Sequence, residues 1–550
     1  MKKRTPIVLS TLIAVSAFIP SGGQMMTNAK GHSESAHYWD EPGHVLPILI
    51  PSNARMAGMK QSALNDIDGA IGQYIESGLT PGAVTFVARS GHIVQRDAYG
   101  YAAVYTDDTF TEMEKPVKMK TDTIFDVASI SKLFTTTAVM MLYEQGHFQL
   151  DDPVAMHLPE FAAKGKEDIT IRQLLTHTSG FAAGKALYAE EGTRESRIQS
   201  VLNHGLINEP GTTYLYSDLN MITLGALVET WSGFRQDEFV KRAITDPLGM
   251  KDTMYNPPAE LKKRIAATEY QPNIGRGLVW GEVHDENAWS LDGVAGHAGV
   301  FSTAKDLAIL AHAYLNDGKY GKVRILKKKT IDLIMKNYNT AFPGDDHGLG
   351  FELNQGWYMD SLADAISAGH TGYTGTALVM SPSNQTIAIV LTNRVHPTRN
   401  TPSINPVRRS FARVVGDSIP VQVKKGSETW FAGYGDQLNN TLTAKVDVKE
   451  EASLSFSTWF RIEDGSDKGD VEISEDGKTF TSIRSFTGKS EDWDKEKALI
   501  PAGTKFIRFS YRTDASVNGR GWYVQDASLK TKHGKKKLKF EADGFERRKD

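Results

Sequence analysis

The stretch Ser129-Ile130-Ser131-Lys132 decides how this chain is interpreted. It follows an apolar lead-in at 123–128 and precedes a helix-competent run at 133–144. Ser129 is therefore predicted at a helix amino terminus, where backbone amides favour an anion. Residues three apart share a helix face, so the Lys132 amine can lie against the Ser129 oxygen and withdraw its proton.

The same pattern occurs again at Ser302-Thr303-Ala304-Lys305. Here Thr303 is followed three residues later by Asp306, which is typical of a capping box at a helix start. We therefore interpret the second copy as local capping chemistry and the first as the candidate nucleophile.

The composition limits the chemistry that the chain can perform. Its 550 residues allow three or four domains, and 40% hydrophobic residues indicate a folded protein. The 63 Lys and Arg against 66 Asp and Glu leave a formal charge of −3, so no nucleic-acid partner is expected. With no cysteine, the nucleophile must carry oxygen or nitrogen.

The amino terminus has the layout of a secretory signal peptide at 1–29, with basic residues, an apolar stretch and small residues at the cleavage point. We expect a secreted protein that can associate with the cell wall. No later segment reaches spanning length without charges, so no transmembrane anchor is expected in the mature chain.

Strand patterns lie at both ends of a long helical middle. A helix at 56–78 precedes a hairpin at 83–98, and two further strands are predicted at 376–380 and 386–391. We expect an α/β (α+β) domain at 46–423, with an antiparallel sheet flanked by helices and an inserted all-helical lobe. Short β runs then predict a β-sandwich accessory domain at 426–530. The basic tail at 531–550 is expected to be solvated or attached to anionic wall polymers.

Two later segments carry further candidate groups. A lysine acts as a base only when it is neutral, which requires burial or a second proton-handling group, and Tyr216 on a predicted loop is the candidate. A tyrosine packed by its ring is the alternative. The stretch Gly369-His370-Thr371-Gly372-Tyr373 precedes a strand, and its glycines allow a substrate to approach the backbone.

In this order the three elements resemble the penicillin-recognising serine hydrolases, which include class C β-lactamases, DD-peptidases and related esterases and amidases. The likeness spans about 57–419 and includes the segment 171–180. It implies a β-lactamase/transpeptidase-like fold and an acyl-enzyme. The roles that it implies are a nucleophile at Ser129, an acid/base pair at Lys132 and Tyr216, a substrate edge at His370, Thr371 and Gly372, and an oxyanion hole from the amides of Ser129 and Tyr373.

Two positions depart from the family pattern. Asp218 stands where the family's second motif has Asn, so a group that only accepts hydrogen bonds replaces an amide near the substrate. His370 stands where the third motif often has Lys, and a partly charged histidine is a weaker anchor for a carboxylate. These departures weaken a β-lactamase assignment more than a hydrolase assignment.

The stretches 281–288 and 293–301 look like the cell-wall amidase branch of this superfamily, which cuts between N-acetylmuramic acid and L-alanine. His284, Asp285 and His297 either bind substrate or are structural hydrogen-bonding groups, and both interpretations remain open. No metal-binding pattern supports a zinc site, so no metal or cofactor is expected.

Residues 430–529 resemble the jelly-roll module of immune-inhibitor-type metalloproteases. Asp436, Glu463 and Asp526 there are either calcium ligands or ordinary turn carboxylates. The sequence thus predicts a secreted serine hydrolase that cleaves an amide of peptidoglycan or muropeptides, of amidase or peptidase type. The alternatives are a β-lactamase, DD-carboxypeptidase or esterase of the same fold, or a penicillin-binding receptor that does not turn over.

Overall fold

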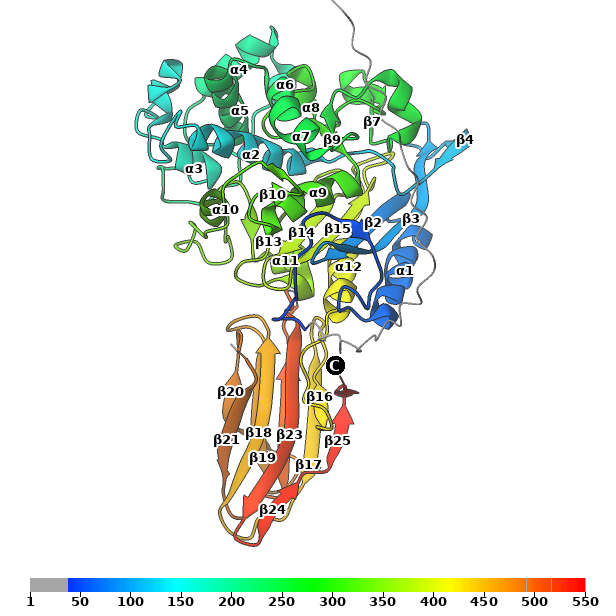
Figure 1. Ribbon diagram of the computed structural model, residues 1–550, viewed down its shortest axis with the longest axis vertical. Helices are drawn as coiled ribbons and strands as arrows, with labels where there is room; N and C mark the ends of the chain where they lie inside the picture. Colours follow the sequence, from blue (N-terminus) through cyan, green and yellow to red (C-terminus); the bar gives the residue numbers. More distant parts are fainter. Residues whose placement is uncertain (1–37, 491, 516, 550) are drawn as a thin grey trace, which may run out of the picture. The chain divides into compact units, whose positions relative to one another are not determined.

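A computed structural model describes residues 38–490, 492–515 and 517–549. The signal peptide expected at 1–29 lies outside these residues. A mixed helix and strand part runs to about residue 423, and an all-β part follows it (Figure 1). None of the helices described is long and apolar enough to cross a membrane.

The first part is built on an eight-stranded sheet assembled from both ends of its segment. The central strands β2 and β15 consist of buried residues, because helices cover both faces. All pairs are antiparallel except the short parallel pair β1–β3 at one edge. In spatial order the strands are β1 (Ile50–Pro51), β3 (His92–Tyr105), β2 (Gly82–Arg89), β15 (Thr386–Thr392), β14 (Ala377–Ser381), β13 (Ala368–Thr371) and β12 (Glu352–Leu353), with β4 (Glu112–Lys118) paired to β3.

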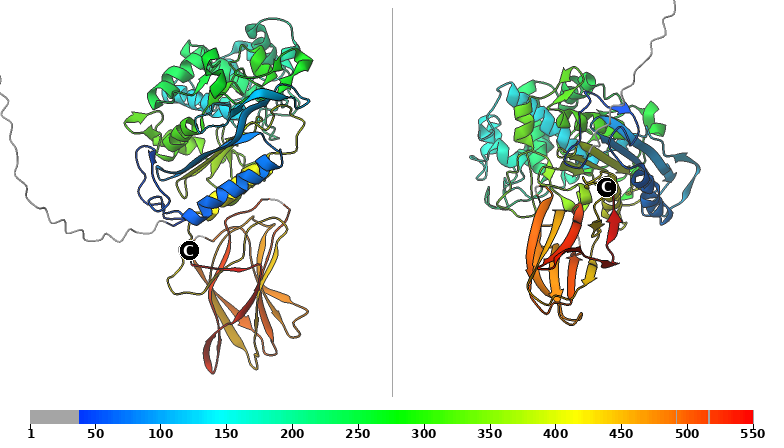
Figure 2. Two further views of the ribbon diagram at one scale, coloured as in Figure 1. Left: turned by 90° about the vertical axis from the view of Figure 1, so that its right-hand side faces the viewer. Right: turned by 60° about the horizontal axis from the view of Figure 1, so that its bottom comes forward.

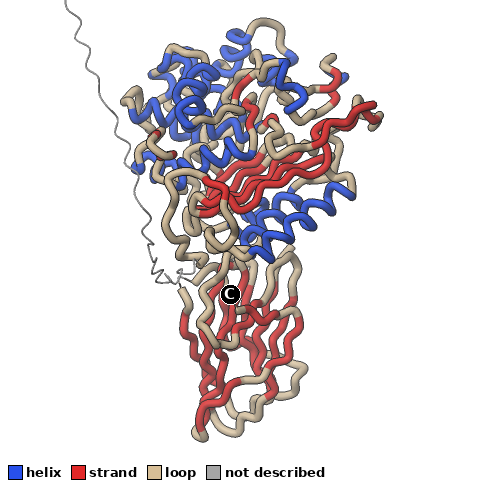
Figure 3. Tube along the Cα trace, turned by 45° about the vertical axis from the view of Figure 1, so that its right-hand side comes forward, coloured by secondary structure: helices blue, strands red, loops and turns tan. Residues whose placement is uncertain are grey.

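Helices form a layer on each face of this sheet (Figures 2 and 3). On one face α1 (Gln61–Glu76) lies beside α12 (Asn405–Asp417). Helix α1 buries Leu64, Ile67 and Ile71, which recur at the helical spacing that the sequence predicted. The other face carries α2 (Ser131–Glu144) and α9 (Ala304–Leu315), whose apolar residues share one core with the sheet.

The middle of the chain is mainly helical, which confirms the predicted lobe. A small sheet of β5 (Phe125–Asp126), β9 (Val300–Ser302) and β6 (Met254–Tyr255) leads into the nucleophile segment. The remaining helices are α3 (Ile171–Leu175), α4 (Arg194–Leu202), α5 (Asp218–Ser232), α6 (Gln236–Val240), α7 (Asp246–Leu248), α8 (Glu286–Ser290), α10 (Lys328–Ile334) and α11 (Gly356–Met359).

The all-β part consists of two antiparallel sheets around an apolar core that includes Leu454, Phe509 and Trp522. This arrangement confirms the predicted β-sandwich. One sheet has the order β21 (Asp494–Ile500), β18 (Ala452–Arg461), β23 (Gly521–Thr531), β16 (Thr429–Phe431) and β26 (Glu546–Arg548), with β24 (Gly534–Lys537) paired to β23. The other has the order β20 (Thr481–Phe486), β19 (Lys468–Ser474), β22 (Phe506–Arg512), β17 (Asn439–Lys445) and β25 (Phe540–Asp543).

The carboxyl-terminal segment differs from the expected solvated tail. Its strands β24, β25 and β26 pair with β23, β17 and β16, so 534–548 belongs to the sandwich. Leu538 and Phe545 are buried and anchor the segment, while the lysines of β24 are exposed. Lysines suit an edge strand because they oppose pairing with a further chain.

Candidate active site

Ser129 lies in the short 3-10 turn Ala128–Ile130, directly before α2, as predicted. Ala128 has a φ of 47°, a left-handed conformation that is unfavourable for a residue with a Cβ. The buried carboxylate of Asp126 holds this turn: its two oxygens accept hydrogen bonds from the amides of Ala128 and His284, at 2.8 and 2.6 Å. Backbone strain next to the nucleophile is thus compensated by fixed hydrogen bonds.

The third motif packs directly against the nucleophile turn. A Cβ on Gly372 would lie 2.4 Å from the carbonyl oxygen of Val127 and 2.1 Å from Thr376 Oγ1, so only glycine fits there. The hydroxyls of Thr374 and Thr376 donate to the carbonyls of Asp126 and Val127, at 2.8 and 3.1 Å. These contacts fix the end of β13 beside Ser129.

Lys132 is the hub of the polar contacts. Its Nζ lies 3.0 Å from Ser129 Oγ, 2.9 Å from Asp218 Oδ1 and 3.2 Å from the carbonyl oxygen of His297. The Nζ also lies 4.7 Å from the centre of the Tyr216 ring. The structure therefore brings together the three residues of the predicted catalytic set.

The protonation of this set differs from the expected neutral lysine. Burial alone would lower the pKa of Lys132, but the charge of Asp218, followed by Tyr216, outweighs burial and raises that pKa above its ordinary value. Burial raises the pKa of Tyr216 to about 12, although Lys132 opposes the shift. The resting site thus holds an ammonium and a neutral phenol, because Asp218 supplies a charge that Asn would lack.

The family-like segment 171–180 positions the second motif. The amide of Ser217 donates to His177 Nδ1 at 3.2 Å, and the amide of Leu215 donates to the His177 carbonyl at 2.9 Å. The rings of His177 and Tyr216 are 4.8 Å apart. Asp218 begins α5 and turns its carboxylate to Lys132, so its observed partner is the lysine, whereas the sequence predicted a substrate contact.

His370 is neutral in this environment. Its side chain is buried, and Nδ1 donates to the carbonyl of Thr371 at 2.7 Å. Burial, with a smaller contribution from Lys132, lowers the pKa of His370 to about 3. The partly charged histidine expected from the sequence is therefore uncharged near neutral pH and cannot act as a cationic anchor.

A cavity of about 390 Å³ opens beside the nucleophile. Ser129 and Tyr373 both line this cavity, as the predicted oxyanion hole requires. The oxyanion hole itself stays a prediction. The other residues that line the cavity include Tyr216, His370, Thr371, Gly372, Glu352, Arg394 and Arg408.

Two arginines supply the positive charge in this cavity. Arg408 Nη2 donates to the Gly372 carbonyl at 2.7 Å, and the Arg394 guanidinium lies 5.1 Å from the centre of the Tyr373 ring. The Nε atoms of both arginines are buried and have no hydrogen-bond partner within the part of the chain that the structure describes. Sequence reasoning missed both arginines, because neither belongs to a motif. For Arg394, the available signal was its position two residues after β15.

The same cavity contains a carboxyl group that the sequence did not single out. Burial raises the pKa of Glu352 to about 7, and its Oε2 has no hydrogen-bond partner among the residues described. The cavity therefore combines two guanidinium groups with two carboxyl groups, those of Glu352 and Asp345.

His284, Asp285 and His297 contact protein groups. His284 Nε2 lies 2.9 Å from Glu269 Oε2, and His297 Nε2 lies 2.8 Å from Asp285 Oδ1. Asp285 also caps α8, accepting from the Ala288 amide at 2.7 Å. His284 lies against Tyr373, with ring centres 5.7 Å apart. These contacts favour the structural interpretation, and the predicted substrate-binding role of the three residues stays a prediction.

The geometry supports nucleophilic catalysis by a serine. Lys132 bridges Ser129 and Asp218, so transfer of one ammonium proton to Asp218 leaves a neutral amine that can take the Ser129 proton. The fold and these groups together define a serine hydrolase.

Comparison with known proteins names the family. The family model described as Beta-lactamase matches residues 67–413, more than half of the chain, and the protein belongs to this family. A relative from Escherichia coli (strain K12), described as "Putative D-alanyl-D-alanine carboxypeptidase", is 34% identical over 394 residues, covering 66% of this chain and 89% of the relative. A relative from Salmonella schwarzengrund (strain CVM19633) with the same description is 33% identical over 395 residues, with the same coverage.

Solved structures agree on the fold. EstCE1, described as a hydrolase with promiscuous acyltransferase activity, matches with a TM-score of 0.51 at 23% identity, covering 65% of this chain and 99% of that one. A penicillin-binding protein homologue from Caulobacter crescentus matches with a TM-score of 0.50 at 19% identity and the same coverage. The likeness of 430–529 to immune-inhibitor-type modules stays a prediction.

Proposed function

We propose that this protein is a DD-carboxypeptidase that removes the terminal D-alanine from peptidoglycan peptides through an acyl-enzyme on Ser129. The curated relatives named above support this choice among the serine hydrolase activities. The observation that carries it is the pair of arginines in the cavity beside Ser129. A carboxypeptidase must recognise a free carboxylate next to the scissile bond, and guanidinium groups suit that task.

The neutral state of His370 strengthens this assignment. Because the third motif offers no cation here, a substrate carboxylate needs another positive group, and Arg394 and Arg408 line the same cavity. Arg408 is tied to the Gly372 carbonyl, so it also stiffens the substrate edge. Arg394 is the better candidate for direct contact, since its Nη1 has one side-chain partner, Thr401 Oγ1 at 3.0 Å.

In the proposed reaction Ser129 attacks the carbonyl of the penultimate D-alanine. Lys132 takes the Ser129 proton as its own proton passes to Asp218, and the leaving amine is protonated through Lys132 or the Tyr216 phenol. Water then attacks the ester while the same groups act in reverse. If the protein is exported as its amino terminus predicts, the substrate is the peptidoglycan outside the membrane.

The test compares two peptides ending in D-Ala-D-Ala, one with a free carboxylate and one with a carboxamide. We expect the enzyme to release D-alanine from the first peptide. Cleavage of the second should be at least about a hundredfold slower, because a buried cation left without a carboxylate partner costs about 3 kcal/mol. Arg394→Gln should remove this preference, while Arg96→Gln on the exposed face of β3 should keep it.

Equal cleavage of the two peptides contradicts the proposal. Release of L-alanyl peptide from N-acetylmuramoyl peptide, without release of D-alanine, would favour the amidase activity that the stretch 281–301 predicted. A chromogenic cephalosporin measured in parallel separates β-lactamase activity, and a permanent adduct on Ser129 without product would favour a receptor.

A further inference from the structure

The sandwich holds a carboxylate cluster that the active site does not use. From the sequence, Asp436, Glu463 and Asp526 were interpreted either as calcium ligands or as ordinary turn carboxylates. In the structure these three residues have different partners. Asp436 accepts from Asn518 Nδ2 at 2.6 Å, and Asp526 accepts from the Ser427 hydroxyl at 2.7 Å. Glu463 instead lies with two carboxylates that the sequence did not suggest, Asp467 and Asp514.

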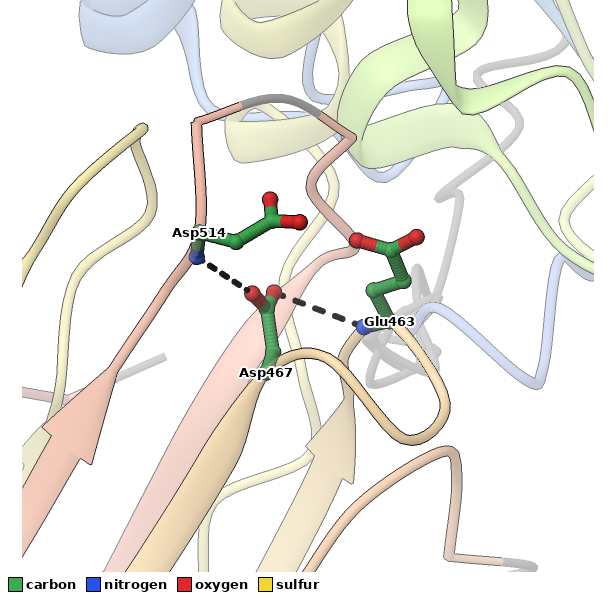
Figure 4. Close-up of side chains that lie close together, drawn as sticks. All are labelled: Glu463, Asp467 and Asp514. Carbon is green, nitrogen blue, oxygen red and sulfur yellow. Dashed lines mark hydrogen bonds between the residues drawn. The ribbon is translucent and has the colours of Figure 1, made fainter.

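The cluster joins two loops at one end of the sandwich. Glu463 and Asp467 lie between β18 and β19, and Asp514 lies just after β22. Figure 4 shows the three carboxylates turned toward a common space, and one oxygen from each lies within 4.8 Å of the others. The Asp467 oxygens accept from the amides of Glu463 and Asp514, at 3.4 and 3.3 Å, which holds the two loops together.

Burial makes this cluster unusual. The Asp467 side chain is 0% exposed, and within the part of the chain described neither Asp467 nor Glu463 pairs with a lysine or arginine. Asp467 is the buried carboxylate of the cluster, and placing its charge beside two other carboxylates is costly, because it loses hydration and is repelled by its neighbours. A bound cation removes both costs.

A second observation points to the same space. Tyr511 on β22 is also 0% exposed, and its hydroxyl has no hydrogen-bond partner of good geometry among the described residues. The hydroxyl lies close enough to Asp467 for a weak hydrogen-bond contact with that carboxylate, so the phenol faces the cluster. The Glu463 Oε2 atom is buried without a partner as well. Two oxygen atoms at this cluster thus lack the contacts that buried polar groups normally have.

We propose that Glu463, Asp467 and Asp514 bind one Ca²⁺ ion. The ligand set is all oxygen, which suits a hard cation and disfavours zinc. Ca²⁺ bonds of about 2.3–2.6 Å place opposite ligand oxygens about 4.6–5.2 Å apart, whereas Mg²⁺ bonds of about 2.1 Å place them near 4.2 Å. The three carboxylate oxygens lie within 4.8 Å of one another, a spacing that a calcium ion can bridge. Calcium would then clamp the β18–β19 and β22–β23 loops.

The test uses the full chain, stripped with a chelator and returned to CaCl₂ or MgCl₂. Calorimetry should show one Ca²⁺ site, with a dissociation constant on the order of 10⁻⁴–10⁻³ M. A hundredfold excess of Ca²⁺ over that constant should raise the unfolding midpoint by roughly 5–10 °C. Mg²⁺ at the same concentration should give less than half of that shift.

Asp514→Asn is the decisive variant, since Asp514 is exposed and the protein should fold without its charge. It should weaken Ca²⁺ binding at least tenfold and abolish the midpoint shift. Glu475→Gln, an exposed carboxylate on the same sandwich, is the matched control and should keep both. The proposal is overturned by an absence of Ca²⁺ binding to the wild type, by an equal response to Mg²⁺, or by equal losses in the two variants.

Discussion

Two copies of the same four-residue pattern occupy equivalent positions in this protein and perform different tasks. Ser129 and Ser302 each lie two residues before a helix, and Lys132 and Lys305 are each the second residue of that helix. Yet Lys132 is 1% exposed and contacts Ser129, whereas Lys305 is exposed. The four-residue pattern and its position relative to the start of the helix are the same in both copies. Neither feature therefore determines which serine can act as a nucleophile.

The difference lies in the residue between serine and helix. Ile130 has helical dihedrals, with φ −60° and ψ −19°, so Ser129 continues the helical path and faces Lys132. Thr303 is extended, with φ −101° and ψ 160°, because its hydroxyl caps α9 by accepting from the Asp306 amide at 3.2 Å. Ser302 therefore belongs to β9 and contacts the Thr253 hydroxyl at 2.8 Å. In the second copy the capping residue Thr303 turns the backbone away from the helical path, so Ser302 does not face Lys305.

The largest expected effect comes from removing each serine oxygen. Ser129→Ala should lower kcat on D-Ala-D-Ala peptides by at least about 10⁴-fold, since the nucleophile is lost. Ser302→Ala should stay within about threefold of wild type. D-alanine release and mass spectrometry of a trapped acyl-enzyme measure both. Equal losses in the two variants would contradict the assignment of different tasks.

The two lysines should differ almost as strongly. Lys132→Met keeps much of the side-chain volume but removes the proton-handling group, and we expect a loss in kcat of about 10³-fold. Lys305→Met should leave kcat unchanged, because its amine is exposed. Circular dichroism checks that Lys132→Met folds despite leaving Asp218 without its partner. A folded Lys132→Met protein with wild-type kcat would show that another group takes the Ser129 proton.

The fold could be predicted because its signals are local. The helical spacing of Leu64, Ile67 and Ile71 and the turn-bounded β runs correctly indicate a helix-flanked sheet followed by a sandwich. The solvated tail was wrongly expected for 534–548, since a count of lysines does not show that Leu538 and Phe545 are buried as anchors. Charge alone was a poor guide, because the exposed lysines of β24 belong to a paired strand.

The candidate site could be predicted only in part. Ser129 and Lys132 lie three residues apart in one segment, so their contact follows from local geometry. The charge state of Lys132 does not, because it depends on Asp218, which approaches from another helix. Arg394 and Arg408 likewise reach the cavity from separate elements. The charge states in the site depend on contacts between residues far apart in the sequence. A search for local motifs cannot find such contacts.

Asp218→Asn tests the electrostatic difference between the two copies, since Lys132 pairs with Asp218 whereas Lys305 is exposed. If Asp218 receives the proton through Lys132, its loss should lower kcat about a hundredfold with KM within about threefold. Removing the carboxylate also lowers the pKa of Lys132, so the acid limb of the kcat profile, along which this base loses its proton, should move to lower pH. A rise in KM with kcat unchanged would instead support the substrate contact predicted from the sequence.

The smallest effect concerns the cap that separates the two copies. Thr303→Ala removes the hydroxyl that accepts from the Asp306 amide and should lower the free energy of unfolding by about 1 kcal/mol, with kcat unchanged at 25 °C. Thr303→Ser keeps a capping hydroxyl, so chemical denaturation should place its stability within about 0.5 kcal/mol of wild type. Because β9 keeps its pairing with β5, Ser302 with Phe125 and Phe301 with Asp126, the cap can be lost without moving the nucleophile turn. A tenfold fall in kcat for Thr303→Ala at full folding would mean that the second copy supports catalysis after all.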